Sequence, residues 1–171
     1  GFIDIDGKAV LPENLRNWQT HIAHVPQVVF LSDCSIEENI AFGVSKDQID
    51  INLVKSAAKK AQISDLIDGW KDGYKTIVGE RGMRLSGGQR QRIGIARALY
   101  KKAQVIVFDE ATSALDYNSE NSISEAINNM RGSVTIIIIA HRLTTLRNCD
   151  LIIELGDKGI LNISTYDQIN T

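Results

Sequence analysis

The sequence predicts an α/β fold with a parallel β-sheet at its centre. Residues 105–108 and 134–139 form apolar runs rich in β-branched residues, without alternation of polar and apolar side chains. Such runs are typical of strands buried on both faces of a parallel sheet. Between them, Ile123, Ile127 and Met130 recur at helical spacing. A strand, helix, strand order is the unit from which parallel sheets are built.

The composition is that of an ordinary globular domain. The chain has 171 residues, of which 43% are hydrophobic and 23% charged, so it is long enough to bury a core. A formal net charge of −2 gives no overall field to hold a polyanion, and we expect no nucleic-acid partner. Cys34 and Cys149 lack metal-ligand spacing, which leaves one disulfide or two free thiols, and we favour free thiols. The longest apolar stretch, residues 134–140, is far shorter than the roughly 20 residues that span a bilayer.

The first part of the chain predicts two strands and then helices. Residues 2–7 alternate apolar and polar side chains before a glycine turn, which predicts a half-buried edge strand. Residues 22–26 predict a second strand that ends at Pro26, because proline cannot donate to a ladder. Ser35-Ile36-Glu37-Glu38 has capping-box spacing, so a short helix should begin at Ser35 and run toward Gly43. Helical spacing of apolar residues predicts a further helix around residues 53–61.

The second part continues with a loop, a helix, the parallel strands and a hairpin. Residues 69–82 are turn-rich and irregular, and they lead into Leu85-Ser86-Gly87-Gly88-Gln89. An apolar stripe predicts a helix over residues 90–101, with two glycines at its N-terminus. Apolar runs at 151–155 and 160–163, separated by Gly156-Asp157-Lys158-Gly159, predict a terminal hairpin.

The glycine pair before the helix is a candidate phosphate-binding site. A helix N-terminus presents backbone N–H groups and the positive end of its dipole to an anion. Ser86 would add a hydroxyl donor, and Gly87 and Gly88 would let the backbone approach phosphate oxygens without a Cβ in the way. The alternative is a glycine-rich turn that only caps the helix.

Asp109 and Glu110 are candidate catalytic residues. They end a predicted buried strand, and ligands of open α/β sheets bind beyond the carboxyl ends of the strands. Asp109 would hold Mg²⁺ through water, because Mg²⁺ dehydrates reluctantly, and Glu110 would polarise an attacking water. The alternative is a solvated acidic loop after a strand.

These two segments together carry a family resemblance that extends over essentially the whole chain. The string from Leu85 to Gln89 resembles the signature sequence, and the strand that ends in Asp109-Glu110 resembles the Walker B strand, of ATP-binding cassette (ABC) ATPases. The resemblance implies a fold with a P-loop NTPase-like parallel sheet core and an inserted helical subdomain. We expect residues 1–30 and 102–171 to be α/β core portions of a partial ABC ATPase domain over 1–171, and residues 31–101 to be the helical subdomain.

The resemblance also implies roles for individual residues. Gln27 resembles the Q-loop glutamine, which senses the nucleotide, contributes to the Mg²⁺ site and touches the transmembrane partner. Ser113-Ala114-Leu115-Asp116 resembles the D-loop, whose aspartate reaches across a dimer interface, and His141 resembles the switch histidine that contacts the γ-phosphate. Taken alone, Gln27 could be a loop glutamine, Asp116 a helix N-cap, and His141 a strand-end histidine. The implied nucleotide-binding residues are Gln27, Ser86, Gly87, Gly88, Gln89 and Asp116; the catalytic ones are Glu110 and His141; the metal-binding ones are Asp109 and Gln27.

Two further segments indicate which kind of ABC ATPase the chain resembles. Asn39-Ile40-Ala41-Phe42-Gly43 and Val78-Gly79-Glu80-Arg81-Gly82 resemble segments of exporter-type ABC ATPases, and the chain is similar to the ATPase halves of lipid or polysaccharide flippases. The resemblance implies ATP and Mg²⁺ as cofactors, a transmembrane domain of the same transporter as partner, and a second ATP-binding domain, with a homodimer favoured. It implies a place at the cytoplasmic face of the cell (inner) membrane.

One expected motif does not occur in the sequence. ABC ATPases need a P-loop, G-x-x-x-x-G-K-[ST], but around Gly7-Lys8 the pattern would require glycine where Phe2 stands and Ser or Thr where Ala9 stands. We therefore expect a fragment that lacks the Walker A region and the P-loop strand, and that is inactive in isolation. The alternative function is a soluble ABC ATPase that acts on nucleic acid or in translation, which would be expected to show heptads or a basic extension.

Overall fold

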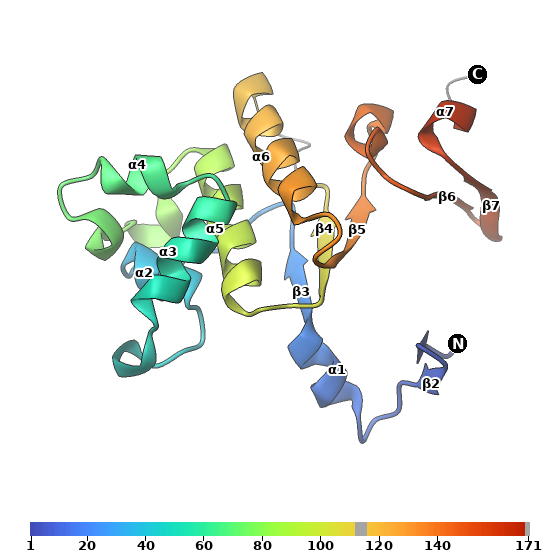
Figure 1. Ribbon diagram of the computed structural model, residues 1–171, viewed down its shortest axis with the longest axis horizontal. Coiled ribbons are helices and arrows are strands. Elements are labelled where there is room, and N and C mark those ends of the chain that lie inside the picture. Colours follow the sequence, from blue (N-terminus) through green and yellow to red (C-terminus); the bar gives the residue numbers. More distant parts are fainter. Residues whose placement is uncertain (112–115, 170–171) are drawn as a thin grey trace.

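The computed structural model describes residues 1–111 and 116–169. In this part of the chain, the central sheet has three parallel strands in the order β3-β4-β5. These are β3 (Ile22–Val25), β4 (Val105–Asp109) and β5 (Thr135–Ile139). A helical unit lies to one side of this sheet, and separate hairpins lie near the two chain ends (Figure 1). The predicted α/β fold with a central parallel sheet is confirmed.

The strand register aligns the carboxyl ends of all three strands. Val25 pairs with Phe108, and Phe108 pairs with Ile138. Helix α6 (Tyr117–Met130) connects β4 to β5 and carries the predicted apolar stripe, with Ile123, Ile127 and Met130 buried. The residues that follow the three strands therefore emerge at one edge of the sheet.

The prediction that both parallel runs are buried on both faces is wrong for β5. Ile136 and Ile138 pack against the core, but Ile137 is 48% exposed and Ile139 49% exposed. In the ranges 1–111 and 116–169, β5 is an edge strand, and its packed face is the one that meets the core cluster containing the α6 stripe. A continuous apolar run gives no information about which face is covered, because every residue in it is apolar.

The helical unit has its own buried side chains. It contains α2 (Ile36–Ile40), α3 (Ile51–Lys60), α4 (Ser64–Asp68) and α5 (Gly87–Tyr100), joined by short 3₁₀ turns η1 (Lys46–Gln48), η2 (Gly73–Lys75) and η3 (Glu80–Gly82). Ile36, Val54 and Ile93 are completely buried where α2, α3 and α5 meet. The predicted helices are confirmed, and α5 begins earlier than predicted, at Gly87.

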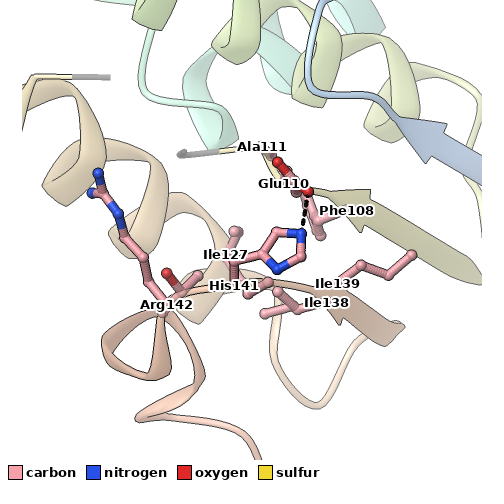
Figure 2. Close-up of a pocket in the computed structure, with 10 residues that line it drawn as sticks. Phe108, Glu110, Ala111, Ile127, Ile138, Ile139, His141 and Arg142 are labelled. Carbon is pink, nitrogen blue, oxygen red and sulfur yellow. Dashed lines mark ion pairs between the residues drawn. The ribbon is translucent and has the colours of Figure 1, made fainter. Parts of the chain in front are cut away.

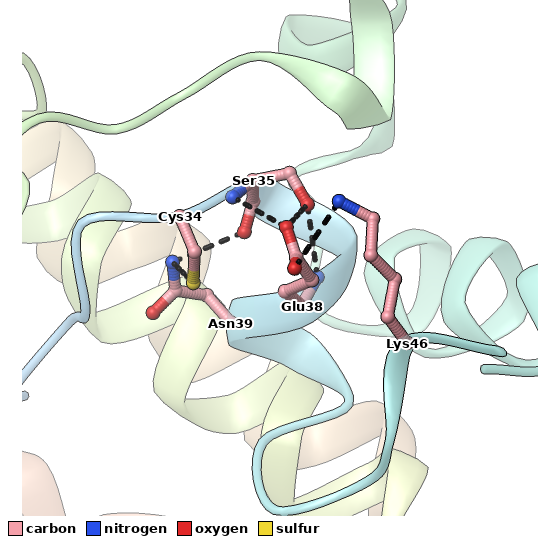
Figure 3. Close-up of polar contacts among 5 residues, drawn as sticks. All are labelled: Cys34, Ser35, Glu38, Asn39 and Lys46. Atoms are coloured by element: carbon pink, nitrogen blue, oxygen red, sulfur yellow. Dashed lines mark hydrogen bonds and ion pairs between the residues drawn. The ribbon is translucent and has the colours of Figure 1, made fainter. Parts of the chain in front are cut away.

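A capping box fixes the start of α2 (Figure 3). The Glu38 backbone N–H donates to Ser35 Oγ at 3.3 Å, and the Ser35 backbone N–H donates to Glu38 Oε2 at 3.0 Å. The Ser35 hydroxyl also donates to Glu38 Oε2 at 2.5 Å. This bond, the one from the Ser35 N–H, and Lys46 Nζ at 3.4 Å from the carboxylate lower the pKa of Glu38 below its usual value. The fully buried Asn39 donates to the carbonyls of Ser32 and Ser35, which closes the preceding turn.

The chain ends differ in how well the sequence predicts them. The terminal hairpin is confirmed as β6 (Ile152–Gly156) and β7 (Gly159–Ser164), followed by α7 (Tyr166–Ile169). At the other end, β1 (Asp4–Ile5) and β2 (Lys8–Ala9) form a small hairpin ahead of α1 (Leu15–His21), and Phe2 is 89% exposed. The predicted strand and the glycine turn after it are confirmed at Asp4–Ile5 and Asp6-Gly7, where both turn residues take positive φ. The predicted half-burial is wrong, because β1 pairs only with β2 and Ile3 is 63% exposed.

Both cysteines are free thiols, as favoured from the sequence. Burial is the main cause that raises the pKa of the Cys34 and Cys149 thiols. Among residues 1–111 and 116–169, no helix is both long and apolar enough to cross a membrane.

The capping box makes the first testable prediction. Ser35→Ala should lower the free energy of unfolding by about 1 kcal/mol at pH 7, because a backbone N–H at the start of α2 loses its acceptor. Glu38 has a lowered pKa in the folded state, so its contribution is present above its usual pKa of 4.5 and is lost as the pH falls through the lower folded value. The difference between wild type and variant should therefore shrink below pH 4.5, measured by urea unfolding at several pH values.

Ser45→Ala is the matched control, because Ser45 precedes η1 without a side-chain capping bond. It should change stability by less than about 0.5 kcal/mol. Equal losses at Ser35 and Ser45 would contradict the capping role.

Candidate active site

Three residues from three strand ends meet at the carboxyl edge of the sheet. Gln27 follows β3, Glu110 follows β4 and His141 follows β5. Gln27 Nε2 donates to Glu110 Oε2 at 3.2 Å, and His141 Nε2 lies 2.7 Å from Glu110 Oε1. Figure 2 shows the histidine ring directed at the carboxylate. The strand register thus brings both oxygens of one carboxylate against side chains predicted as site residues.

The backbone of Glu110 is in an unusual conformation. Its φ is +49°, in the left-handed region that non-glycine residues rarely adopt. Its N–H still donates to the carbonyl of Ile139 at 3.0 Å, so the ladder between β4 and β5 extends one residue beyond the strand. Backbone conformations of this kind concentrate at functional sites. Glu110, the residue with this conformation, is also the one whose carboxylate meets His141 and Gln27.

A small cavity of about 80 Å³ lies beside this carboxylate. Its lining includes the apolar residues Phe108, Ile127 and Ile138 and the polar residues Glu110, His141, Arg142 and Thr145 (Figure 2). A buried water needs about 10–15 Å³ of such volume and polar partners. The cavity is therefore large enough for water next to Glu110.

Asp109, the last residue of β4, has a partner that the sequence analysis missed. His24 Nε2 lies 3.6 Å from Asp109 Oδ2, and both side chains are about half exposed. His24 pairs in register with Val107, two residues before Asp109, so His24 and Asp109 share a face of the sheet. This proximity could be read from the sequence only once the register of β3 against β4 was known.

The start of α5 differs from the prediction at Gln89. The Gln89 backbone N–H donates to Ser86 Oγ at 3.2 Å, and the Ser86 N–H donates to Gln89 Oε1 at 2.9 Å. We expected the N–H groups here to be bare, but the one at Gln89 is capped. The signal was present, because Ser86-x-x-Gln89 has the same capping-box spacing as the segment at Ser35.

Gly88 contacts another helix, in addition to its predicted role near phosphate. A Cβ at Gly88 would lie 2.4 Å from Ser119 Oγ and 2.6 Å from Ser119 Cβ. Asp116 holds Ser119 in place, since the Ser119 N–H and hydroxyl donate to its carboxylate at 3.0 and 2.7 Å. Asp116 is thus the N-cap of α6, which was the alternative reading of this residue. The other D-loop positions, 113–115, lie outside the described residues.

A parallel sheet with an acidic residue, a glutamine and a histidine at its carboxyl edge defines the class of open α/β proteins that bind ligands beyond the carboxyl ends of their strands. Within that class, the chain belongs to the ABC transporter family, whose model matches residues 1–113.

Individual relatives agree with this assignment. The chain is similar to an ATP-dependent lipid A-core flippase from Saccharophagus degradans, with 43% identity over 99% of the chain and 28% of the flippase. It is 42% identical to the multidrug resistance protein pgp-1 from Caenorhabditis elegans, over 99% of the chain and 13% of that protein. A solved structure of a bacterial Atm1-family ABC exporter with ATP bound matches with a TM-score of 0.83 and 38% identity, over 99% of this chain and 30% of that one. The chain therefore spans less than a third of the length of these relatives.

The contact between α5 and α6 makes the second prediction. Gly88→Ala should lower the free energy of unfolding by about 1–3 kcal/mol, because the added methyl group would overlap Ser119 and force the helices apart. Thermal or denaturant unfolding of the purified chain measures the effect.

Gly69→Ala is the matched control, because a Cβ at Gly69 meets its nearest atoms at 3.5 and 3.6 Å, which is ordinary contact distance. It should leave stability within about 0.5 kcal/mol of wild type or raise it slightly. A Gly88→Ala variant as stable as Gly69→Ala would show that the two helices are not in close contact.

Proposed function

We propose that this chain is the C-terminal portion of the ATP-binding and hydrolysing domain of an ABC exporter, in which ATP hydrolysis drives transport across a membrane. The observation that carries the proposal is the Glu110 carboxylate, held by Gln27 and His141 beside a cavity large enough for water. Family membership implies ATP binding. The names of the relatives, a flippase and an ATP-bound exporter among them, support the exporter subclass.

Glu110 is the residue we propose to activate the attacking water. Its carboxylate would orient that water toward the γ-phosphate and accept its proton as the oxygen–phosphorus bond forms. His141, which is 83% exposed, would extend from Glu110 to a γ-phosphate oxygen and donate to it. Gln27 would hold the second oxygen of Glu110 and so fix the direction of the carboxylate.

Asp109 and Gln27 are the residues we propose to hold Mg²⁺. Both offer oxygen atoms at the carboxyl edge of the sheet, and Mg²⁺ prefers oxygen ligands. In the described ranges, no cluster of three or more His, Cys, Asp or Glu side chains forms a metal cage. Mg²⁺ is usually held by one or two carboxylates together with waters and phosphate oxygens. Bound there, the ion would neutralise charge on the phosphates.

The N-terminus of α5 is the surface we propose to meet ATP bound by a second ATP-binding domain, in a homodimer. Ser86 is exposed and Gly87 partly exposed, whereas the preceding Leu85 is buried. The hydroxyl of Ser86 and the backbone N–H groups of Gly87 and Gly88 would face the phosphates across the interface, where the helix dipole favours negative charge. Gln89, whose own N–H is held by Ser86, would lie beside them. Asp116 would approach the same interface from the start of α6.

An apolar surface beside α2 supports a transmembrane domain as partner. Val28 is 78% exposed, Phe30 59% and Phe42 52%. Arg97 holds this surface together, since its guanidinium lies 4.6 Å from the Phe42 ring and donates to the carbonyl of Phe30 at 3.1 Å. Exposed apolar side chains gathered in this way are typical of interaction sites.

A transmembrane partner also agrees with the division of the chain and the cellular location that we propose. Residues 1–30 and 102–171 would form the α/β core portions and residues 31–101 the helical subdomain that meets the membrane domain. In the loop at 78–82, Val78 is buried, whereas Glu80 and Arg81 point outward. Such a domain would lie at the cytoplasmic face of the cell membrane.

Glu110→Gln in the full exporter tests the proposed function. The variant should lose roughly 10²- to 10⁴-fold in ATP turnover while it still binds ATP, because the amide cannot accept the proton of the attacking water. Phosphate release measures turnover, and calorimetry measures binding.

Glu154→Gln is the matched control, because Glu154 is exposed in β6, away from the site. It should keep wild-type turnover. Undiminished turnover in Glu110→Gln would remove Glu110 from the proposed mechanism.

A further inference from the structure

Gln91 is a buried polar residue that the proposed mechanism does not use. It lies in α5, two residues after the end of the segment Leu85–Gln89, and is only 3% exposed. Its Nε2 donates to the carbonyl oxygen of Gln27 at 2.6 Å and to that of Pro26 at 3.0 Å. Both hydrogens of the amide therefore bind the backbone of the segment that carries the Q-loop glutamine.

The amide group of Gln91 stabilises the structure only through its Nε2, because its oxygen makes no hydrogen bond to the described residues. Gln91 Oε1 is buried and has no hydrogen-bond partner among residues 1–111 and 116–169. A buried acceptor without a partner is unfavourable, and an apolar side chain of similar length would avoid it. Helix packing alone would therefore favour an apolar residue at this position.

A second contact on the same face of α5 points to the same segment. Gly94 lies three residues after Gln91, so the two residues share a face of the helix. A Cβ at Gly94 would come within 2.7 Å of Val29 Cγ2 and 3.5 Å of Val25 Cγ1. Helix α5 thus sits directly on the chain from Val25 to Val29, held by bonds at Gln91 and by close packing at Gly94.

The position of α5 itself does not depend on Gln91. Ile93, Ile95 and Ala96 are completely buried in the core. At the far end of the helix, Lys101 Nζ donates to the carbonyls of Gln19 and Ile22 at 2.8 and 2.6 Å. With α5 anchored in these ways, the bonds from Gln91 fix the loop rather than the helix.

We propose that Gln91 is a positioning residue for hydrolysis, which fastens the backbone of Gln27 to α5 so that the Gln27 side chain reaches Glu110. The contacts are continuous: Gln91 binds the Gln27 carbonyl, and Gln27 Nε2 binds Glu110 Oε2 at 3.2 Å. A displacement of the signature helix would therefore move the residue that orients the catalytic carboxylate. The expected effect on hydrolysis rests on the proposed ATPase function. The contact between Gln91 and the Gln27 segment rests on the geometry alone.

Gln91→Met tests the proposal in the full exporter, because methionine keeps the length of the side chain and removes both donors. We expect kcat for ATP hydrolysis to fall about 10- to 100-fold, while KM for ATP stays within about twofold, since a small misplacement of a catalytic group mainly affects the transition state. Gln48→Met is the matched control, because Gln48 is exposed in η1, and it should keep the wild-type kcat. An unchanged kcat in Gln91→Met would overturn the catalytic part of the proposal.

A second measurement on the chain itself does not depend on ATP hydrolysis. In NMR spectra of Gln91→Met, the side-chain amide signal of Gln27 and the backbone signals of Gln27 and Val28 should shift, while those of Ile95 and Ala96 stay in place. Unmoved Gln27 signals would overturn the contact. If the wild-type exporter hydrolyses no ATP but the Gln27 signals move, the proposed function fails and the contact stands.

Gly94→Ala provides a variant in case Gln91→Met does not fold. Alanine favours the helix relative to glycine, but its methyl group would push Val29 away from α5. The same Gln27 signals should move, and kcat should fall in the same range. A Gly94→Ala variant with wild-type Gln27 signals and wild-type kcat would count against the proposal.

Discussion

The parallel pairing of β4 with β3 on one side and β5 on the other is the constraint on which the site depends. Val25, Phe108 and Ile138 lie in one row across the sheet. Gln27 and His141 therefore emerge on either side of Glu110 although they are far apart in sequence. A slip of one residue in either pairing would turn side chains to the opposite face of the sheet. Because Ile106 and Phe108 must stay buried, they hold the register and with it the positions of the polar side chains at the strand ends.

The second constraint is how closely α5 approaches its neighbours. Gly88 lets the helix meet Ser119 of α6, and Gly94 lets it meet Val29 beyond β3. At both positions even one methyl group would overlap a neighbouring atom. Gln91 lies between these two glycines and binds the Gln27 segment. Helix α5 is therefore in contact with both the start of α6 and the loop after β3. Its N-terminus cannot shift without disturbing both.

Local patterns in the sequence predicted most elements, because caps, turns and apolar periods involve neighbouring residues. The box at Ser35, the crossover stripe on α6 and the hairpin at 151–163 are of this kind. The exposed face of β5, the pairing of His24 with Asp109 and the bonds of Gln91 were not predicted, because each depends on how distant segments pack. The bonds from Gln91 join residues 64 and 65 positions apart. The cap at Gln89 was local and could have been found.

The geometry at Glu110 shows why the three strand-end residues form one unit. Each oxygen of the carboxylate has a partner from a different loop, Gln27 for one and His141 for the other, and the backbone at Glu110 is turned into the left-handed region to present them. Removing one partner would change how the carboxylate meets the other, so the contributions of the two partners are not additive. A change in either loop, whether made by α5 through Gln91 or by phosphate at His141, would therefore reach the same two oxygen atoms.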